Sequence, residues 1–172
     1  DEEYKIITKT WYSIDIKENK NIKFKEAVEE LRFIFLDSIK KQIRSDVKIG
    51  FSLSGGIDSS SIACGMRYLY PKEEINTYSY IPEDKKVSEE KYIDFVNSSI
   101  NAKSNKVYFA ENNLNDVIDE FIESQTLPNT GLSFLAEFLI YKKAKKDGIK
   151  VMLDGHGADE ILGGYDGYPE YM

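Results

Sequence analysis

Phe51–Ser60, with the sequence Phe-Ser-Leu-Ser-Gly-Gly-Ile-Asp-Ser-Ser, indicates the fold, because an apolar run ends in a glycine corner and a helical pattern follows. Two adjacent glycines after a strand let the backbone turn sharply and approach a ligand without interference from Cβ atoms. Such a corner directs several N–H groups and a helix N-terminus to one point, which suits an anion such as phosphate. The carboxylate of Asp58 would repel a phosphate, so it implies a bound Mg²⁺. The plainer alternative is a Gly-Gly turn that only joins a strand to a helix.

A second corner of the same kind stands near the end of the chain. Val151–Tyr165 reads Val-Met-Leu-Asp-Gly-His-Gly-Ala-Asp-Glu-Ile-Leu-Gly-Gly-Tyr, so an apolar run again ends in a glycine-rich turn with acidic residues. Asp159 reaches the same metal and phosphates as Asp58 if the two strands lie close together in the sheet.

Apolar runs alternate with helical patterns along the chain. We expect strands at 47–53, 75–81, 106–109 and 149–153, and helices from Phe24, after Ser60, from Ser88, from Asn113 and over 132–147. Ser88 and Asn113 are the expected N-caps, and Gly148 is the expected glycine after the last of these helices. The alternation predicts an α/β fold, a parallel Rossmann-like sheet with helices on both faces. Ligands of such sheets bind at the carboxyl ends of the strands, where both glycine corners fall.

Together the two motifs resemble the synthetase domain of the asparagine synthetase family, a group of ATP pyrophosphatases with a PP-loop. That family pairs Ser-Gly-Gly-x-Asp-Ser with Gly-x-Gly-x-Asp-Glu and a following Gly-Gly-Tyr. Trp11-Tyr12, the stretch 44–50 and the stretch 144–150 also resemble the family, so the likeness covers most of residues 11–168.

The resemblance implies roles for individual residues. It assigns the β- and γ-phosphates and Mg²⁺ to Ser54, Gly55, Gly56, Asp58, Ser59 and Ser60, with Asp159 as the second metal ligand. Adenine is expected at strand ends, at Ser52, Leu53, Tyr80, Asp154 and Gly155. Simpler readings stay open here: Ser59 and Ser60 could only cap a helix, Asp58 could be an N-cap, and Glu160 could only favour a helix start.

His156 is the only histidine in the chain. Asparagine synthetases carry glutamate at this place. A histidine near a developing amide could transfer protons at neutral pH, could line the pocket or could bind a phosphate. His156 and Glu160 are therefore the candidate catalytic residues. Cys64 follows the first corner on a helix, where we expect it to pack in the core.

Two departures from the family limit what the resemblance implies. Leu135-Ala136 stand where many asparagine synthetases have Thr-Pro, which makes aspartate doubtful as the substrate. The chain also ends seven residues after Tyr165 and lacks the N-terminal cysteine of the usual glutaminase domain. We expect residues 1–20 to be a linker or peripheral segment from an upstream domain, and 21–172 to be a nucleotide-binding core that is truncated at its C-terminus.

Composition and charge exclude several classes of partner. The chain has 23 basic and 30 acidic residues and a net charge of −7, which disfavours a nucleic-acid partner. No 18-residue apolar run is present, so no membrane span is expected. One cysteine and no basic-then-apolar leader agree with a cytoplasmic protein.

The resemblance implies ATP-dependent amide-bond formation through an acyl-adenylate, with AMP and pyrophosphate as products. ATP, Mg²⁺ and a carboxylate substrate are the expected ligands. The expected nucleophile is ammonia or an amine, which a glutaminase domain could supply. The product could be asparagine or a related amide or lactam. The alternative is a module that binds ATP and Mg²⁺ without catalysis.

Overall fold

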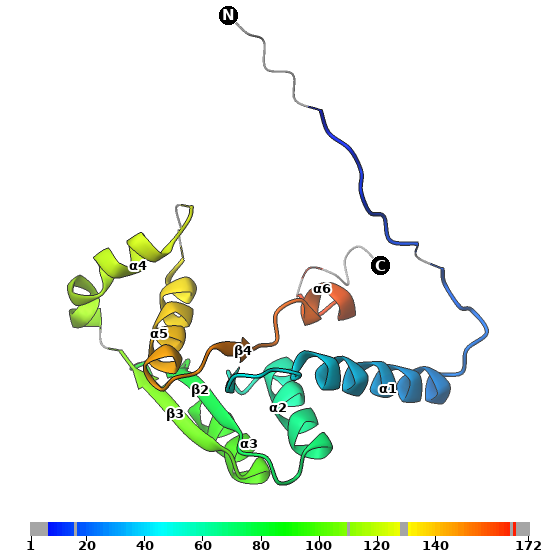
Figure 1. Cartoon of the computed structure of the whole chain (residues 1–172), viewed down its shortest axis with the longest axis horizontal. Coiled ribbons are helices and arrows are strands. Elements are labelled where there is room, and N and C mark those ends of the chain that lie inside the picture. The colour runs from blue at the N-terminus through cyan, green and yellow to red at the C-terminus, as the bar shows by residue number, and fades with distance from the viewer. Residues whose placement is uncertain (1–6, 16, 110, 128–130, 166, 168–172) are drawn as a thin grey trace, which may run out of the picture. The chain divides into compact units, whose positions relative to one another are not determined.

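The computed structural model describes residues 7–15, 17–109, 111–127, 131–165 and 167. Of residues 111–113 and 132 it describes the backbone and not the side chains. Four parallel strands form one sheet in the order β3-β2-β1-β4. The strands are β1 (Ile49–Ser52), β2 (Asn76–Ile81), β3 (Lys103–Tyr108) and β4 (Val151–Leu153) (Figure 1). The predicted parallel α/β sheet is confirmed, with β3 beginning three residues earlier than expected.

The helices alternate with these strands. They are α1 (Phe24–Gln42), α2 (Ile57–Leu69), α3 (Glu90–Ile100), the 3₁₀ helix η1 (Glu111–Asp116), α4 (Ile118–Ser124), α5 (Leu132–Lys146) and α6 (Ala158–Leu162). Gly148 adopts φ +81° just after α5, as predicted for a glycine that ends a helix. The Ser88 hydroxyl accepts a hydrogen bond from the Glu90 N–H at 3.3 Å, although the N-cap of α3 is Glu89.

The predicted cap at Asn113 is wrong. Asn113 lies inside η1, and α4 begins only at Ile118, after Val117. The chain therefore takes a tight 3₁₀ turn where the sequence suggested the first turn of an α-helix. Residues 1–6 and 16 of the expected linker lie outside the described residues, as do residues 128–130 between α4 and α5.

Helices cover the two faces of the sheet because side chains alternate along each strand. Phe51, Ile81 and Leu153 pack with Ala63 of α2 and Ile93 of α3 in one apolar cluster. On the opposite face, Tyr78 packs with Ile140 and Ala144 of α5, and Phe121 of α4 packs with Leu135 and Leu139 of the same helix. Figure 1 shows α2 and α3 on one side of the sheet and α5 on the other.

The chain divides into two compact units, residues 1–34 and 35–172, and the boundary falls within α1. In the second unit, α1 and α2 approach closely at Gly65, where an added Cβ would lie 2.5 Å from Ile39 Cδ1. The expected division into 1–20 and 21–172 stays a prediction. No helix among the described residues is both long and apolar enough to cross a bilayer.

The expected core position of Cys64 is wrong, because its side chain is exposed. Ser59 and Ala63 are the residues of α2 that face the sheet, and Gly65 faces α1. Cys64 lies about 100° around the helix from Ala63 and so points away from the packed stripe. Partial burial nevertheless raises the pKa of its thiol.

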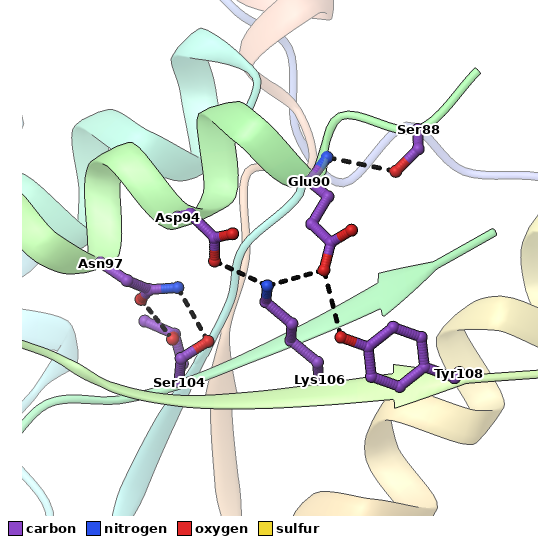
Figure 2. A network of polar contacts seen from close by, with 8 residues as sticks. Ser88, Glu90, Asp94, Asn97, Ser104, Lys106 and Tyr108 are labelled. Carbon is purple, nitrogen blue, oxygen red and sulfur yellow. Dashed lines mark hydrogen bonds and ion pairs between the residues drawn. The ribbon is translucent and has the colours of Figure 1, made fainter. Parts of the chain in front are cut away.

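Polar side chains fasten α3 to the sheet (Figure 2). Asn97 accepts a hydrogen bond from the buried Thr77 hydroxyl at 2.6 Å and donates to Ser104 Oγ at 3.0 Å. Nearer the start of α3, Lys106 Nζ of the edge strand β3 lies 2.7 Å from both Glu90 Oε1 and Asp94 Oδ1. Figure 2 shows this ammonium group between the two carboxylates, and the Tyr108 hydroxyl donates to the same oxygen of Glu90 at 3.1 Å.

The first glycine corner packs against the start of α3, which this polar network attaches to the sheet. A Cβ on Gly55 would lie 3.1 Å from Tyr92 Cβ and 3.2 Å from the backbone nitrogen of Ile93, both in the first turn of α3. The corner therefore rests directly on the helix turn that Lys106 holds to β3 through Glu90 and Asp94. Anything that moves the start of α3 moves the surface against which the corner is folded.

The ion pair gives this region a pH dependence. Hydrogen bonds from Lys106 and Tyr108 lower the pKa of the Glu90 carboxyl below its ordinary value of 4.5. A group with a lowered pKa in the folded state contributes stability above its ordinary pKa and loses it as the pH falls through the lowered value. We expect Glu90→Gln to lower the melting temperature at neutral pH, and this deficit to shrink toward zero as the pH falls below 4.5.

Glu89→Gln is the matched control, because Glu89 is an exposed neighbour that also stands at the start of α3. It removes a charge from the same end of the helix without breaking the contact with Lys106. Thermal unfolding followed by circular dichroism from pH 7 to pH 3 makes the comparison. Equal deficits for the two variants at every pH would contradict a role for the Glu90–Lys106 contact.

Candidate functional site

The two glycine corners meet in one cavity of about 250 Å³ at the carboxyl ends of β1 and β4. Successive strands run outward from β1 to β2 and β3, and β4 then joins the opposite side of β1. The strand order therefore reverses between β1 and β4, which is where open parallel sheets form their ligand crevices. The cavity is lined by Ser52, Ser54, Gly56, Asp58, Ser59, Asp154, Gly155, His156, Gly157, Asp159, Glu160 and Tyr165.

Hydrogen bonds fix the first corner, which joins β1 to α2. Gly55 adopts φ +90°, a conformation that side chains disfavour. The Ser59 hydroxyl reaches back across the turn, where it accepts from the Ser54 N–H at 3.2 Å and lies 3.0 Å from Ser54 Oγ. The Gly56 N–H in turn donates to Ser54 Oγ at 3.3 Å. The serines of the motif thus hold the loop in shape as well as facing the cavity.

Asp58 does not cap α2. The N-cap is Gly56, and Asp58 is the second residue of the helix, in its first turn. No hydrogen bond from a capping side chain is present at this end of the helix. The carboxylate lines the cavity instead, where it is available for a ligand.

Gly155 lets the second corner lie directly on the first. A Cβ at this position would lie 3.0 Å from Asp58 Cβ and 3.0 Å from the backbone nitrogen of Ser59. Such contacts are tighter than nine in ten real Cβ contacts, and neither neighbour is the far end of a flexible side chain. The close approach at Gly155 is therefore one between the two loops of the protein.

The rest of the second corner turns through two more glycines around the short helix α6. Gly157 and Gly163 adopt φ +90° and +69° at its two ends. The N–H groups of Gly163 and Gly164 donate to the carbonyl of Asp159 at 2.9 and 3.1 Å. The Glu160 carboxylate accepts a hydrogen bond from the Tyr165 hydroxyl at 2.7 Å, and this bond lowers the pKa of the Glu160 carboxyl.

The lining of the cavity carries negative charge. It includes four carboxylates, those of Asp58, Asp154, Asp159 and Glu160, whereas neither lysine nor arginine is among the lining residues described. A polyphosphate would be repelled by such a wall unless cations lay between them. Carboxylate oxygens from Asp58 and Asp159 are the hard ligands that Mg²⁺ prefers, so the donor set fits this ion.

Some predicted binding residues lie outside the lining of the cavity. Leu53 is 1% exposed and belongs to the core, and Gly55 faces the start of α3. Ser60 Oγ is buried and has no hydrogen-bond partner among the described residues. Tyr80 packs beside the clusters on the α5 face of the sheet. Their roles in binding a nucleotide stay predictions.

Two side chains at the edge of the cavity were not predicted. Glu137 and Tyr141 come from α5, where the Tyr141 hydroxyl lies 3.1 Å from Asp154 Oδ2, whereas Tyr165 of the Gly-Gly-Tyr motif lines the cavity itself. Glu137 and Tyr141 are four residues apart on one helix face, and this spacing is their only signal in the sequence. Ligand atoms of Glu137, Asp154 and His156 lie within 4.8 Å of one another, so this trio has the donor set for a metal ion.

Comparisons with known proteins agree with this fold and these motifs. A putative glutamine-hydrolysing asparagine synthetase from Methanocaldococcus jannaschii is 32% identical over 141 residues, which cover 82% of this chain and 27% of that protein. The glutamine-hydrolysing asparagine synthetase 1 of Bacillus subtilis is 31% identical over 166 residues, which cover 96% of this chain and 26% of that protein. The chain thus spans about a quarter of the length of these curated relatives.

Among solved structures, an NH₃-dependent NAD synthetase from Campylobacter jejuni superposes with a TM-score of 0.54 at 17% sequence identity. The alignment covers 80% of this chain and 60% of that one. At that identity the likeness shows the fold alone, a parallel sheet with helices on both faces. The family model for asparagine synthase matches residues 30–172, and this chain therefore belongs to the asparagine synthase family.

Proposed function

We propose that this chain is the nucleotide-binding core of an ATP-dependent ligase that forms amide bonds through an acyl-adenylate. The supporting observation is that two corners far apart in sequence line one cavity, with Asp58 and Asp159 both in its wall. A second, independent support is the position of that cavity at the reversal of strand order, where parallel sheets bind ligands.

In the first step, a substrate carboxylate oxygen attacks the α-phosphorus of ATP. The bond from that phosphorus to the bridging oxygen breaks, and pyrophosphate leaves. The uncapped N-terminus of α2 would bind the polyphosphate, and Asp58 and Asp159 would hold Mg²⁺. When bound, the ion neutralises charge on the phosphates, as metals do in phosphoryl and nucleotidyl transfer.

In the second step, the nitrogen of ammonia or an amine attacks the acyl carbon of the adenylate. A carbon–nitrogen bond forms, the carbon–oxygen bond to AMP breaks, and AMP leaves as its anion. The proton lost by the nitrogen goes to a base in the cavity, for which His156 is the candidate. The products are an amide, AMP and pyrophosphate.

The identity of the amide is open between asparagine and another amide or lactam. Relatives of this chain are named as glutamine-hydrolysing, so a glutaminase domain is the proposed source of ammonia. His156 and the Leu135-Ala136 pair differ from the pattern of many asparagine synthetases and favour a different carboxylate substrate. A cytoplasmic location, where ATP is abundant, agrees with the single unpaired cysteine.

The metal roles can be tested by binding. We expect Asp58→Asn and Asp159→Asn each to weaken Mg²⁺-dependent ATP binding at least about tenfold, because each removes a charged ligand from an already acidic wall. Isothermal titration calorimetry with and without Mg²⁺ measures the effect on this chain.

Asp119→Asn is the matched control for Asp58→Asn. Asp119 is likewise the second residue of a helix, α4, and its side chain is exposed, so both substitutions remove the same interaction with a helix dipole. Unchanged affinity in the two cavity variants, with the fold intact by circular dichroism, would remove Asp58 and Asp159 from the metal site.

The proposed chemistry predicts the products. The full-length protein, given ATP, Mg²⁺, an amine donor and a suitable carboxylate, should release pyrophosphate and AMP in equal amounts. Chromatography of the nucleotides together with a pyrophosphatase-coupled assay measures both. ADP and orthophosphate as the sole products would refute an adenylate mechanism, and tight ATP binding without turnover would support the alternative of a non-catalytic binding module.

The contact between the corners predicts a steric effect. Gly155→Ala places a Cβ against Asp58 and the backbone of Ser59, and overpacking of this kind typically costs about 1–3 kcal/mol. We expect ATP affinity to fall roughly tenfold as the corners separate, with a lower melting temperature. Gly167→Ala is the control, because no atom of the described residues lies within 4 Å of its added Cβ. Equal affinities for the two variants would show that the spacing of the corners does not govern binding.

A further inference from the structure

A second network of polar side chains runs from α5 to the edge of the cavity. Glu137 and Tyr141 come from one face of α5, Asp154 follows the last residue of β4, and His156 stands two residues further on. The first three are half-buried, whereas the His156 side chain is 73% exposed and lines the cavity. This second network therefore links the packed side chains of α5 to His156, whose imidazole faces the proposed reaction site.

Asp154 fixes His156 through a single oxygen. Asp154 Oδ1 accepts a hydrogen bond from the backbone N–H of His156 at 3.0 Å and lies 2.8 Å from the imidazole Nδ1. An ionised carboxylate has no proton to donate, so Nδ1 must carry the hydrogen in this contact. In the neutral ring the second nitrogen, Nε2, then has a free lone pair.

Tyr141 holds the other oxygen of Asp154. Its hydroxyl lies 2.6 Å from Glu137 Oε1 and 3.1 Å from Asp154 Oδ2, so a single O–H serves two carboxylates. Burial, followed by the neighbouring Glu137, raises the pKa of the Tyr141 phenol. The phenol therefore keeps its proton and remains a donor throughout the physiological range, which restricts rotation of the Asp154 carboxyl group.

The same trio of Glu137, Asp154 and His156 could in principle bind a metal. In this structure, however, His156 Nδ1 lies against Asp154 Oδ1, and the Tyr141 hydroxyl contacts one oxygen of Glu137 and one of Asp154. The contacts present are those that orient an imidazole, as an aspartate does for the histidine of a catalytic triad.

We propose that Asp154 and Tyr141 are positioning residues that keep neutral His156 in the form protonated at Nδ1, so that Nε2 accepts the proton of the attacking amine. The inference rests on the proposed function for the reaction that it serves. As the amine nitrogen bonds to the acyl carbon and AMP departs, one N–H bond of the amine breaks and its proton moves to Nε2. Amine, adenylate and base account for every atom and charge in this step.

The form of the imidazole is directly measurable, because His156 is the only histidine in the chain. In ¹⁵N-labelled protein, long-range ¹H–¹⁵N correlation spectra distinguish a protonated ring nitrogen from an unprotonated one. We expect the neutral ring to show a protonated Nδ1 and an unprotonated Nε2, measured in the presence of a chelator at a pH where the signals no longer move. The opposite assignment in the wild-type chain would overturn the proposal.

Substitutions test which residues determine the nitrogen of His156 that carries the proton. Asp154→Asn should shift the neutral ring toward protonation at Nε2, since an amide can present a donor to Nδ1. Tyr141→Phe should shift it partly in the same direction. Tyr78→Phe is the matched control, because Tyr78 packs against the same helix and its hydroxyl binds Asp147, outside the lining of the cavity, so the imidazole should keep its wild-type form. An Asp154→Asn chain that folds and keeps the proton on Nδ1 would also overturn the proposal.

The consequence for catalysis is tested in the full-length protein by comparing two half-reactions. Exchange of labelled pyrophosphate into ATP reports adenylate formation, and amide release reports the second step. Tyr141→Phe should lower amide release more than it lowers exchange, and His156→Gln should lower amide release on the order of 10²- to 10⁴-fold. Equal losses in both half-reactions would indicate a merely structural role. Absence of exchange in the wild-type protein would instead refute the proposed function while leaving the spectroscopic result intact.

Discussion

The site depends on the contact that Gly155 makes with the start of α2. A Cβ on Gly155 would lie only 3.0 Å from Asp58 Cβ and from the backbone nitrogen of Ser59, so the two loops pack closely here. Pairing of β4 with β1 brings them to this distance, and the serine hydroxyls of the first corner then hold its shape. The cavity therefore has a wall from each loop, and each loop contributes acidic residues at the carboxyl edge of the sheet.

That arrangement concentrates charge. Like-charged carboxylates in a confined space favour a cation or a proton between them, and two such pairs border the proposed site. In the proposed site Asp58 and Asp159 would share Mg²⁺, whereas Glu137 and Asp154 share the hydrogen of Tyr141. Asp154 lies before Gly155 in the second corner, and Asp159 lies after it. The same loop could therefore serve both the departure of pyrophosphate and the transfer of a proton.

The sequence predicted the features that local patterns determine. The parallel sheet and both corners follow from apolar runs that end in glycine, and Gly148 ends α5 as expected. It did not predict the side chains whose role depends on tertiary contacts. Tyr141 looks like an ordinary residue of an amphipathic helix until β4 places Asp154 beside it. Cys64 was misplaced because the buried stripe of α2 passes through its neighbour Ala63, and Asn113 because a 3₁₀ turn replaces the first turn of α4. The roles of Leu53, Ser60 and Tyr80 depend on a ligand, which no pattern in the chain locates.

The pairing of β4 with β1 also governs when the cavity comes into existence. Phe51 pairs with Leu153, so more than half of the chain separates the two partners, whereas β1, β2 and β3 pair in order of synthesis. Contacts between distant segments form slowly because a long loop must close first. During translation, the first corner would therefore emerge and fold onto α3 well before its partner is made, and the cavity would form only when β4 pairs with β1.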